Sequence, residues 1–378
     1  MVANTRTVGA SGKDHTTIAS AVSWFQANHN FDTDGIGTIS IEDSAEFNER
    51  IVVDGIAGTP STSAYLKITT ALPNRHTGVA GTGHARVKDT VGDRAFDIYT
   101  SFTMIEGLEI QSDTGGGSDE AIRIRPNVFD VLITRNLLWT ARTVLDQDGV
   151  YGGNWAMSAY VDNCIIYGWH RAGINMQNYQ GSATQNWYID HVTVYNCGGE
   201  QTVDSGGIKC GTRLVAQTIF ANVYNTVSVE SPEDFGTRTD GDGTNNWAGT
   251  NNADSDGSLS DPEVSIATNA QQNLVATDVS QISGSFAVFK NLTAGSEDLT
   301  LLDDAAGNLL FGTGVSRAGS EPDPRQDFTT DIAGNLRDLT APNIGAFEFV
   351  AAASVQTPIN PSITNLLSTS VRLTWDQG

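Results

Sequence analysis

The chain has 378 residues, of which 39 are glycine and only 17% are charged. Its formal charge of −23 disfavours a nucleic-acid partner or an anionic membrane, because the summed field repels both. The three cysteines, Cys164, Cys197 and Cys210, contain no C-x-x-C pair, so we expect packed free thiols and no metal knuckle. The many glycines favour a protein rich in turns and short strands.

The first residues, Met1 to Arg6, lack the basic and apolar stretches of a secretory signal. No apolar run approaches the length of a membrane span. We therefore expect a soluble protein without a membrane partner. Either it leaves the cell without a signal, as part of a virus particle would, or a leader has been removed.

An amphipathic helix is predicted near the amino terminus, within residues 1–37. Ile18, Ala21, Val22 and Phe25 form one apolar helical face, and Thr17 stands in front of it as a hydroxyl cap. We expect this helix to cover the open end of the domain that follows.

Short strands follow, and then a regular repeat. Thr38–Ile41 and Tyr65–Ile68 alternate apolar and polar residues, as strands do. Similar segments then start at equal intervals along the chain, at Ile105, Ile133, Val161 and Ile189, and a fifth starts after a slightly shorter interval, at Val215. A repeat of this length, with a strand and a polar turn per unit, predicts a solenoid of about ten coils over residues 38–350.

Each repeat contains two further apolar positions. The residue five positions into each segment is Ile110, Leu138, Ile166, Val194 and Phe220. A second strand in each coil is predicted at Ile122, Val150, Ile174, Ile208 and Val227. Because neighbouring coils lie about 4.8 Å apart, equivalent positions should form columns.

Trp139, Tyr167 and Tyr195 form one such column, because they follow one another at the repeat interval. An exposed aromatic column would bind the faces of sugars, whereas a packed one would be a structural stack of rings. Of these two readings we favour the stack.

A polar column follows the second strand, where the residue after the apolar one is Arg123, Tyr151, Asn175 and Lys209. Four hydrogen-bonding side chains in line on one sheet face would form a groove able to bind an acidic polysaccharide.

Asp146, His170 and Asp204 each stand four residues before the apolar residue of a second strand, and Arg171 follows His170. If the register holds, these residues approach the flank of the polar column. A carboxylate beside an imidazole raises the histidine pKa and orients the ring, so the group could perform acid–base catalysis. The alternative is that all of them are solvated on an outward face. Asp146 and Asp148 are also spaced like the carboxyl pair of a glycosidase.

Residues 231–262 are polar and rich in glycine, with Asp240–Gly243 and Asp254–Gly257 among them. Asx turns in an exposed loop explain this composition. Ca²⁺ is the alternative, because hard cations bind clustered carboxylate oxygens, but the glutamate that an EF-hand loop requires is missing. We expect no cofactor and no metal site.

Both ends of the solenoid resemble a known group of proteins. Gly12–Val22, Thr330–Arg337 and Asn343–Glu348 are similar to the ends of bacterial and phage right-handed parallel β-helix proteins, the pectate-lyase-like superfold. The resemblance implies an all-β, right-handed parallel β-helix over about residues 5–350. It implies no activity, because this superfold hosts lyases, hydrolases, adhesins and phage spikes.

The resemblance also suggests what an enzyme of this fold would need. Lyases of this superfold use an arginine or lysine base, with a cation that neutralises the uronic acid group. Here the basic candidates are Arg123, Arg171 and Lys209, and no carboxylate triad for calcium stands beside them.

Residues 351–378 are predicted to form a linker and a short β tail. Pro358–Thr364 and Val371–Trp375 resemble the first two strands of a fibronectin type III module, a sandwich that needs about 100 residues.

The function that we expect from these observations is a structural or receptor-contacting component of a bacteriophage particle, such as a spike, a fibre or a capsid-surface protein. It would be exposed on the virion, pair with itself as a homotrimer or with other virion proteins, and contact a cell-surface glycan. One alternative is a secreted polysaccharide lyase or depolymerase that acts on an acidic polysaccharide. Another is a bacterial surface adhesin.

Overall fold

The structure is a computed structural model. It describes residues 4–81, 84–89, 94–112, 120–141, 147–179, 183–199, 205–212, 216–239, 243–255, 289–291, 297–301, 310–348, 362–367 and 370–374. The chain divides into two compact units, Met1–Glu348 and Phe349–Gly378, and each is described by itself.

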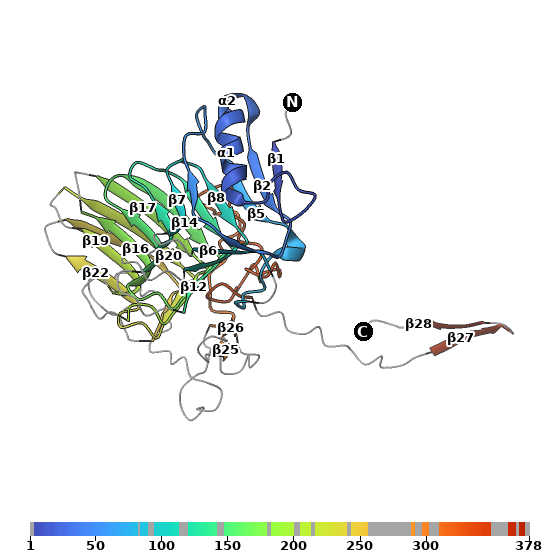
Figure 1. Ribbon diagram of the computed structural model, residues 1–378. Helices are drawn as coiled ribbons and strands as arrows, with labels where there is room; N and C mark the ends of the chain where they lie inside the picture. The colour runs from blue at the N-terminus through green and yellow to red at the C-terminus, as the bar shows by residue number, and fades with distance from the viewer. Residues whose placement is uncertain are drawn as a thin grey trace. The chain divides into compact units, whose positions relative to one another are not determined.

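Helix α1 (Ile18–Asn28) covers the amino-terminal end of the first unit (Figure 1). The Thr17 side chain caps it by accepting a hydrogen bond from the Ser20 backbone N–H at 3.1 Å. Ile18, Val22 and Phe25 are buried against β1, β2 and β4, so the predicted capping helix is confirmed. The short α2 (Phe31–Asp34) and the 3₁₀ turn η1 (Leu72–Asn74) are the other helices of the described residues, none of which is long and apolar enough to cross a bilayer.

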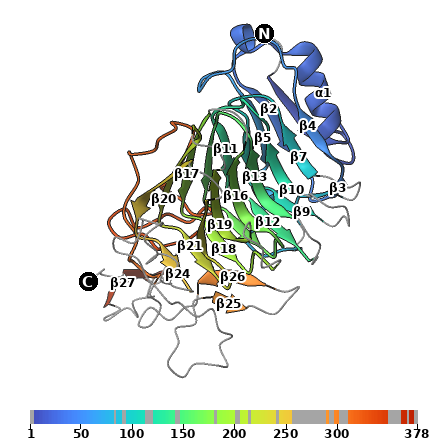
Figure 2. The ribbon, with the colours of Figure 1, turned by 90° about the vertical axis from the view of Figure 1, so that its left-hand side faces the viewer.

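Three parallel sheets build the body of the first unit (Figure 2). The nine-stranded sheet contains β1 (Thr5–Val8), β2 (Gly37–Ile41), β5 (Leu66–Thr70), β8 (Met104–Glu106), β11 (Val131–Thr134), β14 (Met157–Asp162), β17 (Thr184–Asp190), β20 (Thr218–Tyr224) and β23 (Thr244–Thr250). The eight-stranded sheet contains β3 (Glu46–Asn48), β6 (Arg86–Asp89), β9 (Glu109–Ser112), β12 (Leu137–Thr140), β15 (Ile165–Tyr167), β18 (Thr193–Tyr195), β21 (Val227–Val229) and β24 (Ala253–Asp254). The seven-stranded sheet contains β4 (Ile51–Val53), β7 (Arg94–Ile98), β10 (Glu120–Ile124), β13 (Asp148–Gly153), β16 (Ala172–Asn178), β19 (Gly206–Thr212) and β22 (Phe235–Thr239).

Successive strands of the chain enter the three sheets in turn, so the chain winds as a parallel β-helix. The predicted fold is therefore confirmed. Ile105, Ile133, Val161 and Ile189 pair in register on consecutive strands and are fully buried. They belong to the apolar cluster that fills the interior of the solenoid.

The fifth repeat differs from the prediction. The residue that pairs with Ile189 is Val223, which lies further along the chain than the repeat interval predicts, and not Val215, which falls outside the described residues. The intervening coil is longer than the preceding ones. A fixed interval therefore predicts the wrong partner.

The other two columns break at the same coil. Val194 pairs with Ser228, whereas Phe220 pairs with Asn186 and is 42% exposed. On the second strand Ile208 pairs with Phe235. The predicted partner of Ile208, Val227, belongs to the eight-stranded sheet.

A second apolar cluster lies on the outer face of the eight-stranded sheet. Leu137, Ile165 and Val227 contribute to it from that sheet, and Phe289 and Phe347 come from later parts of the chain. Phe289 belongs to an antiparallel pair, β25 (Phe289–Asn291) and β26 (Asp298–Leu301). Later segments therefore cover this face.

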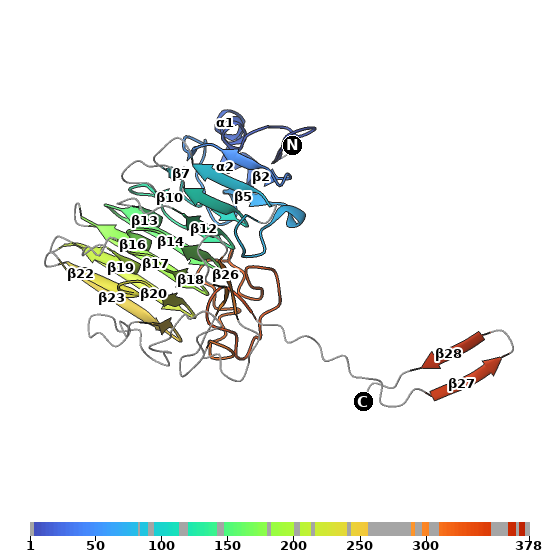
Figure 3. The same cartoon turned by 60° about the horizontal axis from the view of Figure 1, so that its bottom comes forward.

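The strap, residues 310–348, crosses several coils where the nine-stranded sheet turns into the eight-stranded one (Figure 3). Its contacts are hydrogen bonds of Thr313 O with Asn251 at 2.6 Å, of Val315 N with Asn225 at 2.7 Å, of Arg317 with Asp190 at 3.0 Å, and of Gln326 with Asp162 at 2.9 Å. The strap therefore fastens coils that do not touch one another directly.

The buried Arg337 holds the end of the strap. Its Nη2 donates to Asn163 Oδ1 at 2.8 Å and to the carbonyls of Gly345 and Ala346 at 3.1 and 3.0 Å. Its Nη1 lies 3.4 Å from Glu348 Oε2. The guanidinium thus neutralises the buried carboxylate of Glu348. It also joins Gly345 and Ala346 of the strap to Asn163, which lies in the turn after β14.

We expect Arg337→Ala to destabilise the protein by about 3–5 kcal/mol, because it leaves the buried Glu348 without its cation. Urea unfolding followed by tryptophan fluorescence measures the change. The control is Lys13→Ala, which removes an exposed ion pair with Glu42 and should cost no more than about 1 kcal/mol. Equal losses in the two variants would contradict the anchoring role of Arg337.

The second unit contains an antiparallel pair, β27 (Ser362–Leu367) and β28 (Ser370–Thr374). These strands fall close to the two segments predicted from the sequence. A single pair of strands does not define a sandwich, so the fibronectin type III module stays a prediction.

Candidate active site

The outer face of the seven-stranded sheet carries an aligned row of polar side chains. Arg123, Tyr151, Asn175 and Lys209 pair in register on β10, β13, β16 and β19. On β10 the neighbours Ile122 and Ile124 point into the solenoid core, so Arg123 points outward. The predicted polar column therefore forms. We call these four residues, together with Glu120 and Asp148, the polar strip.

Asp148 is a fully buried carboxylate held by donors from the next coil. Arg171 Nε lies 3.0 Å from both of its oxygens, and Arg171 Nη2 also donates to it. Asn175 Nδ2 lies 3.1 and 3.2 Å from the same two oxygens. This set of donors complements the charge of a carboxylate and fixes its orientation.

Glu120 pairs in register with Asp148 on the next coil and is also buried. Arg94 Nε donates to Glu120 Oε2 at 3.2 Å, and Arg123 Nη1 lies 3.6 Å from Oε1. Burial, and then the charge of Asp148, raise the pKa of Glu120 to about 7, although both arginines oppose the shift. Near neutral pH this carboxyl therefore readily carries a proton.

Tyr151 lies between the two arginines of this face, Arg123 and Arg171. Its hydroxyl donates to Gln177 Oε1 at 3.2 Å, and burial raises its pKa to about 12, so it stays a neutral hydrogen-bonding group. The guanidinium carbons of Arg123 and Arg171 lie 5.3 and 5.5 Å from the ring centroid, within reach of a cation–π interaction.

Lys209 ends the strip and forms an ion pair with Glu233. A Cβ at Gly236, on the next strand, would lie 2.2 Å from Lys209 Nζ, so a larger residue there would make the lysine head group shift. The absence of a side chain on Gly236 therefore leaves room for the lysine head.

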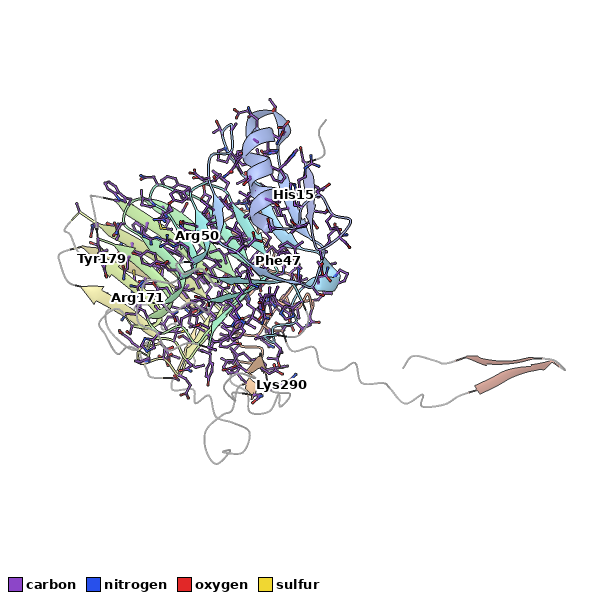
Figure 4. All side chains as sticks on the ribbon, in the orientation of Figure 1. His15, Phe47, Arg50, Arg171, Tyr179 and Lys290 are labelled. Atoms are coloured by element: carbon purple, nitrogen blue, oxygen red, sulfur yellow. The ribbon has the colours of Figure 1, made fainter. Side chains whose placement is uncertain are left out.

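The predicted acid–base group around His170 falls only partly within the described residues. Asp146 and Asp204 lie outside them. His170 lies between β15 and β16, with its ring beside Gly199. Its neighbour Arg171, as described, contacts Asp148. Catalysis by His170, Asp146 and Asp204 thus stays a prediction. In Figure 4, Arg171 lies further from α1 than Arg50 does.

Glu120 is a site residue that the sequence pattern did not predict. A signal was present, because Glu120 precedes Ile122 by two residues, as Asp148 precedes Val150. Aligning the coils at this position would have placed the two carboxyls side by side.

The aromatic column forms on the eight-stranded sheet and is packed. The rings of Trp139 and Tyr167 are stacked, with centroids 6.0 Å apart and planes at 13°. Phe289 meets Tyr195 edge-on at 6.5 Å, within the second apolar cluster. These contacts are those of a structural stack. Sugar binding by this column stays a prediction.

In the part of the chain that the structure describes, no three His, Cys, Asp or Glu side chains are grouped to hold a metal ion. The predicted calcium segments fall largely elsewhere, since residues 240–242 and 256–257 are outside the described ranges. Asp254 is described and is buried in β24.

Known proteins share little sequence with this chain. No family model matches the chain, and no curated protein matches it. Pectate lyase Pel9A is similar in structure, with 11% identity, a TM-score of 0.43, and 86% of this chain and 90% of that chain covered. A pectin methylesterase from Aspergillus niger is similar with 14% identity, a TM-score of 0.40, and 66% and 86% covered. Likeness at this level concerns the fold alone.

We expect Glu120→Gln to stabilise the protein increasingly as the pH rises to about 7. The pKa of Glu120 is about 7 in the folded chain against an ordinary value of 4.5, so stability is lost between these two pH values, where the unfolded chain is ionised at this residue and the folded chain is not. The gain should therefore grow up to about pH 7 and then level off at about 3 kcal/mol, at about 1.4 kcal/mol per pKa unit. Thermal unfolding at several pH values measures it.

The control is Glu46→Gln, which changes an exposed glutamate on the eight-stranded sheet and should show no such trend. If the gain in stability of Glu120→Gln instead shrinks as the pH rises, the arginines stabilise the ionised form of Glu120, and the pKa of this residue is lowered and not raised.

Proposed function

We propose that the protein is a polysaccharide depolymerase that hydrolyses glycosidic bonds at the polar strip. The observation that carries this proposal is the pair Glu120 and Asp148. These two carboxyls lie in register on neighbouring coils, one readily protonated near neutral pH and the other held by Arg171 and Asn175.

Hydrolysis of a glycoside needs two such carboxyl groups in different protonation states. Glu120 would give its proton to the leaving glycosidic oxygen. Asp148 would take a proton from the water whose oxygen bonds to the anomeric carbon, or would attack that carbon itself. In either case the glycosidic bond breaks and the water supplies one proton and one hydroxyl to the products.

The surroundings of this pair fit an extended ligand. Arg123, Tyr151, Asn175 and Lys209 span three inter-coil steps, about 14 Å at about 4.8 Å per step. Two of the four, Arg123 and Lys209, carry a positive charge, and they are the groups to which we assign the contacts with the acid groups of a polysaccharide.

We place the ligand on the seven-stranded sheet because the pair Glu120 and Asp148 lies there. Arg123, with 25% of its side chain exposed, is where the polar strip reaches the surface, and the two carboxyls are buried beside it.

A polysaccharide lyase is the alternative, with Lys209, Arg171 or Arg123 as the base. Arg171 is engaged with Asp148, and Lys209 with Glu233. Both basic groups are thus engaged by carboxylates, which disfavours their use as the base. This favours hydrolysis over elimination.

The location of such an enzyme on a phage particle, its assembly as a homotrimer and the adhesin alternative stay predictions. Mass spectrometry of purified particles tests the first of these: a fixed copy number of this chain would support the virion location, and its absence from particles would exclude it.

We expect the protein to release new reducing ends from an acidic polysaccharide, and Glu120→Gln and Asp148→Asn to lower the rate at least about 100-fold each, because general acid–base groups contribute on this scale. Reducing-sugar release from a panel of acidic polysaccharides measures the rate. The Glu46→Gln control should keep full activity.

Absorbance from unsaturated uronate, recorded in the same reactions, separates the two chemistries. If this absorbance appears and is lost in Lys209→Ala, the enzyme is a lyase. The depolymerase proposal is wrong if two results coincide. No polysaccharide of the panel is cleaved, and the Glu120→Gln and Asp148→Asn variants bind these polysaccharides as tightly as the parent protein does.

A further inference from the structure

Asp97 lies at the α1 end of the polar strip, in register with Arg123, and is fully buried. Three arginines converge on this one carboxylate. Arg50 Nη2 and Arg125 Nη2 each donate to Asp97 Oδ2 at 2.7 Å, and Arg94 Nη1 donates to the same oxygen at 3.3 Å. Burial alone would raise the pKa of Asp97, but the bonds from Arg125 and Arg50 lower it, so this residue is a permanent anion.

Arg94 links Asp97 to the proposed proton donor. Its Nη1 is bonded to Asp97, while its Nε donates to Glu120 Oε2 at 3.2 Å. Arg94 and Glu120 are themselves paired in register on β7 and β10. The guanidinium is therefore shared between two carboxyls, and each of these two bonds is longer than those of Arg50 and Arg125 to Asp97.

We propose that Asp97 is a positioning residue of the active centre, which holds Arg94 in this bridging position and so keeps Glu120 available as the proton donor. The inference rests on the proposed function. If Asp97 were uncharged, Arg94 could turn both of its nitrogens onto Glu120, and a bidentate arginine strongly favours the ionised form of a carboxyl.

Other charges also face Glu120 among the described residues. Arg123 and Arg125 follow it in the chain, Arg94 and Asp97 come from β7, Asp148 comes from β13, and Arg171 precedes β16. Of these groups, Arg94 is the one that joins Glu120 to a carboxylate outside the catalytic pair. Changes at Asp97 and at Arg94 should therefore shift Glu120 in opposite directions, which a merely structural role would not do.

The test combines Asp97→Asn with Arg94→Gln. In Asp97→Asn the alkaline limb of the pH profile of kcat/KM should shift to lower pH by about one unit, which is a tenfold decrease in the proton affinity of Glu120. In Arg94→Gln the limb should shift to higher pH by about as much. Asp97→Glu, which restores the charge, should return the limb towards that of the parent protein.

Glu120 can also be observed without turnover. Its carboxylic C=O band in the infrared, assigned by its absence in Glu120→Gln, should titrate at lower pH in Asp97→Asn and at higher pH in Arg94→Gln. If this titration shifts but no polysaccharide is cleaved, the coupling between Asp97 and Glu120 stands and the depolymerase function falls.

A loss of activity that is equal at every pH, with an unmoved limb and an unmoved infrared titration, would overturn the inference and leave Asp97 a structural ion-pair residue. If Asp97→Asn fails to fold, Arg94→Gln decides alone: an unmoved or lowered limb in that variant overturns the proposal.

Discussion

Backbone hydrogen bonding between consecutive coils is the constraint on which the candidate site depends. Each strand of the seven-stranded sheet is held in register with the next, whatever the length of chain that connects them. The chain between Asn175 and Lys209 is longer than the chain between Glu120 and Asp148, yet both pairs are direct neighbours. Loops can therefore vary without moving the side chains that face one another across the coils.

Burial then determines how these neighbours behave. A carboxyl that is removed from water favours its neutral form unless cations and donors compensate for the loss. Asp97 has three arginines and stays ionised, Asp148 has Arg171 and Asn175, and Glu120 shares Arg94 with Asp97 while it faces the charge of Asp148. The same sheet thus holds carboxyls in different states. Acid–base chemistry needs one carboxyl that is protonated and one that is ionised. The burial of Glu120 that produces this difference lowers the stability of the folded protein.

The regular part of the fold was predictable because its apolar residues recur at one interval. The columns from Ile105 to Ile189 and from Arg123 to Lys209 follow directly from the apolar pattern. The prediction failed at Val215, because a longer coil shifts the next partner to Val223, and no local signal marks the change. Glu120 was not predicted, because the acidic candidates were aligned four residues before each apolar position, whereas Glu120 and Asp148 stand two residues before it. The strap was out of reach, since its contacts are irregular and join residues far apart in the chain, as in the bond between Arg317 and Asp190.

In a simple solenoid each rung is stabilised only by the rungs above and below it, so such proteins can fray from either end. The segment from residue 310 to 348 changes this, because it ties rungs from Phe102 to Asn251 to one another through side chains. Opening one rung would then disturb contacts several rungs away. The array should consequently melt as a single cooperative body, and proteases should find few partly opened intermediates to attack.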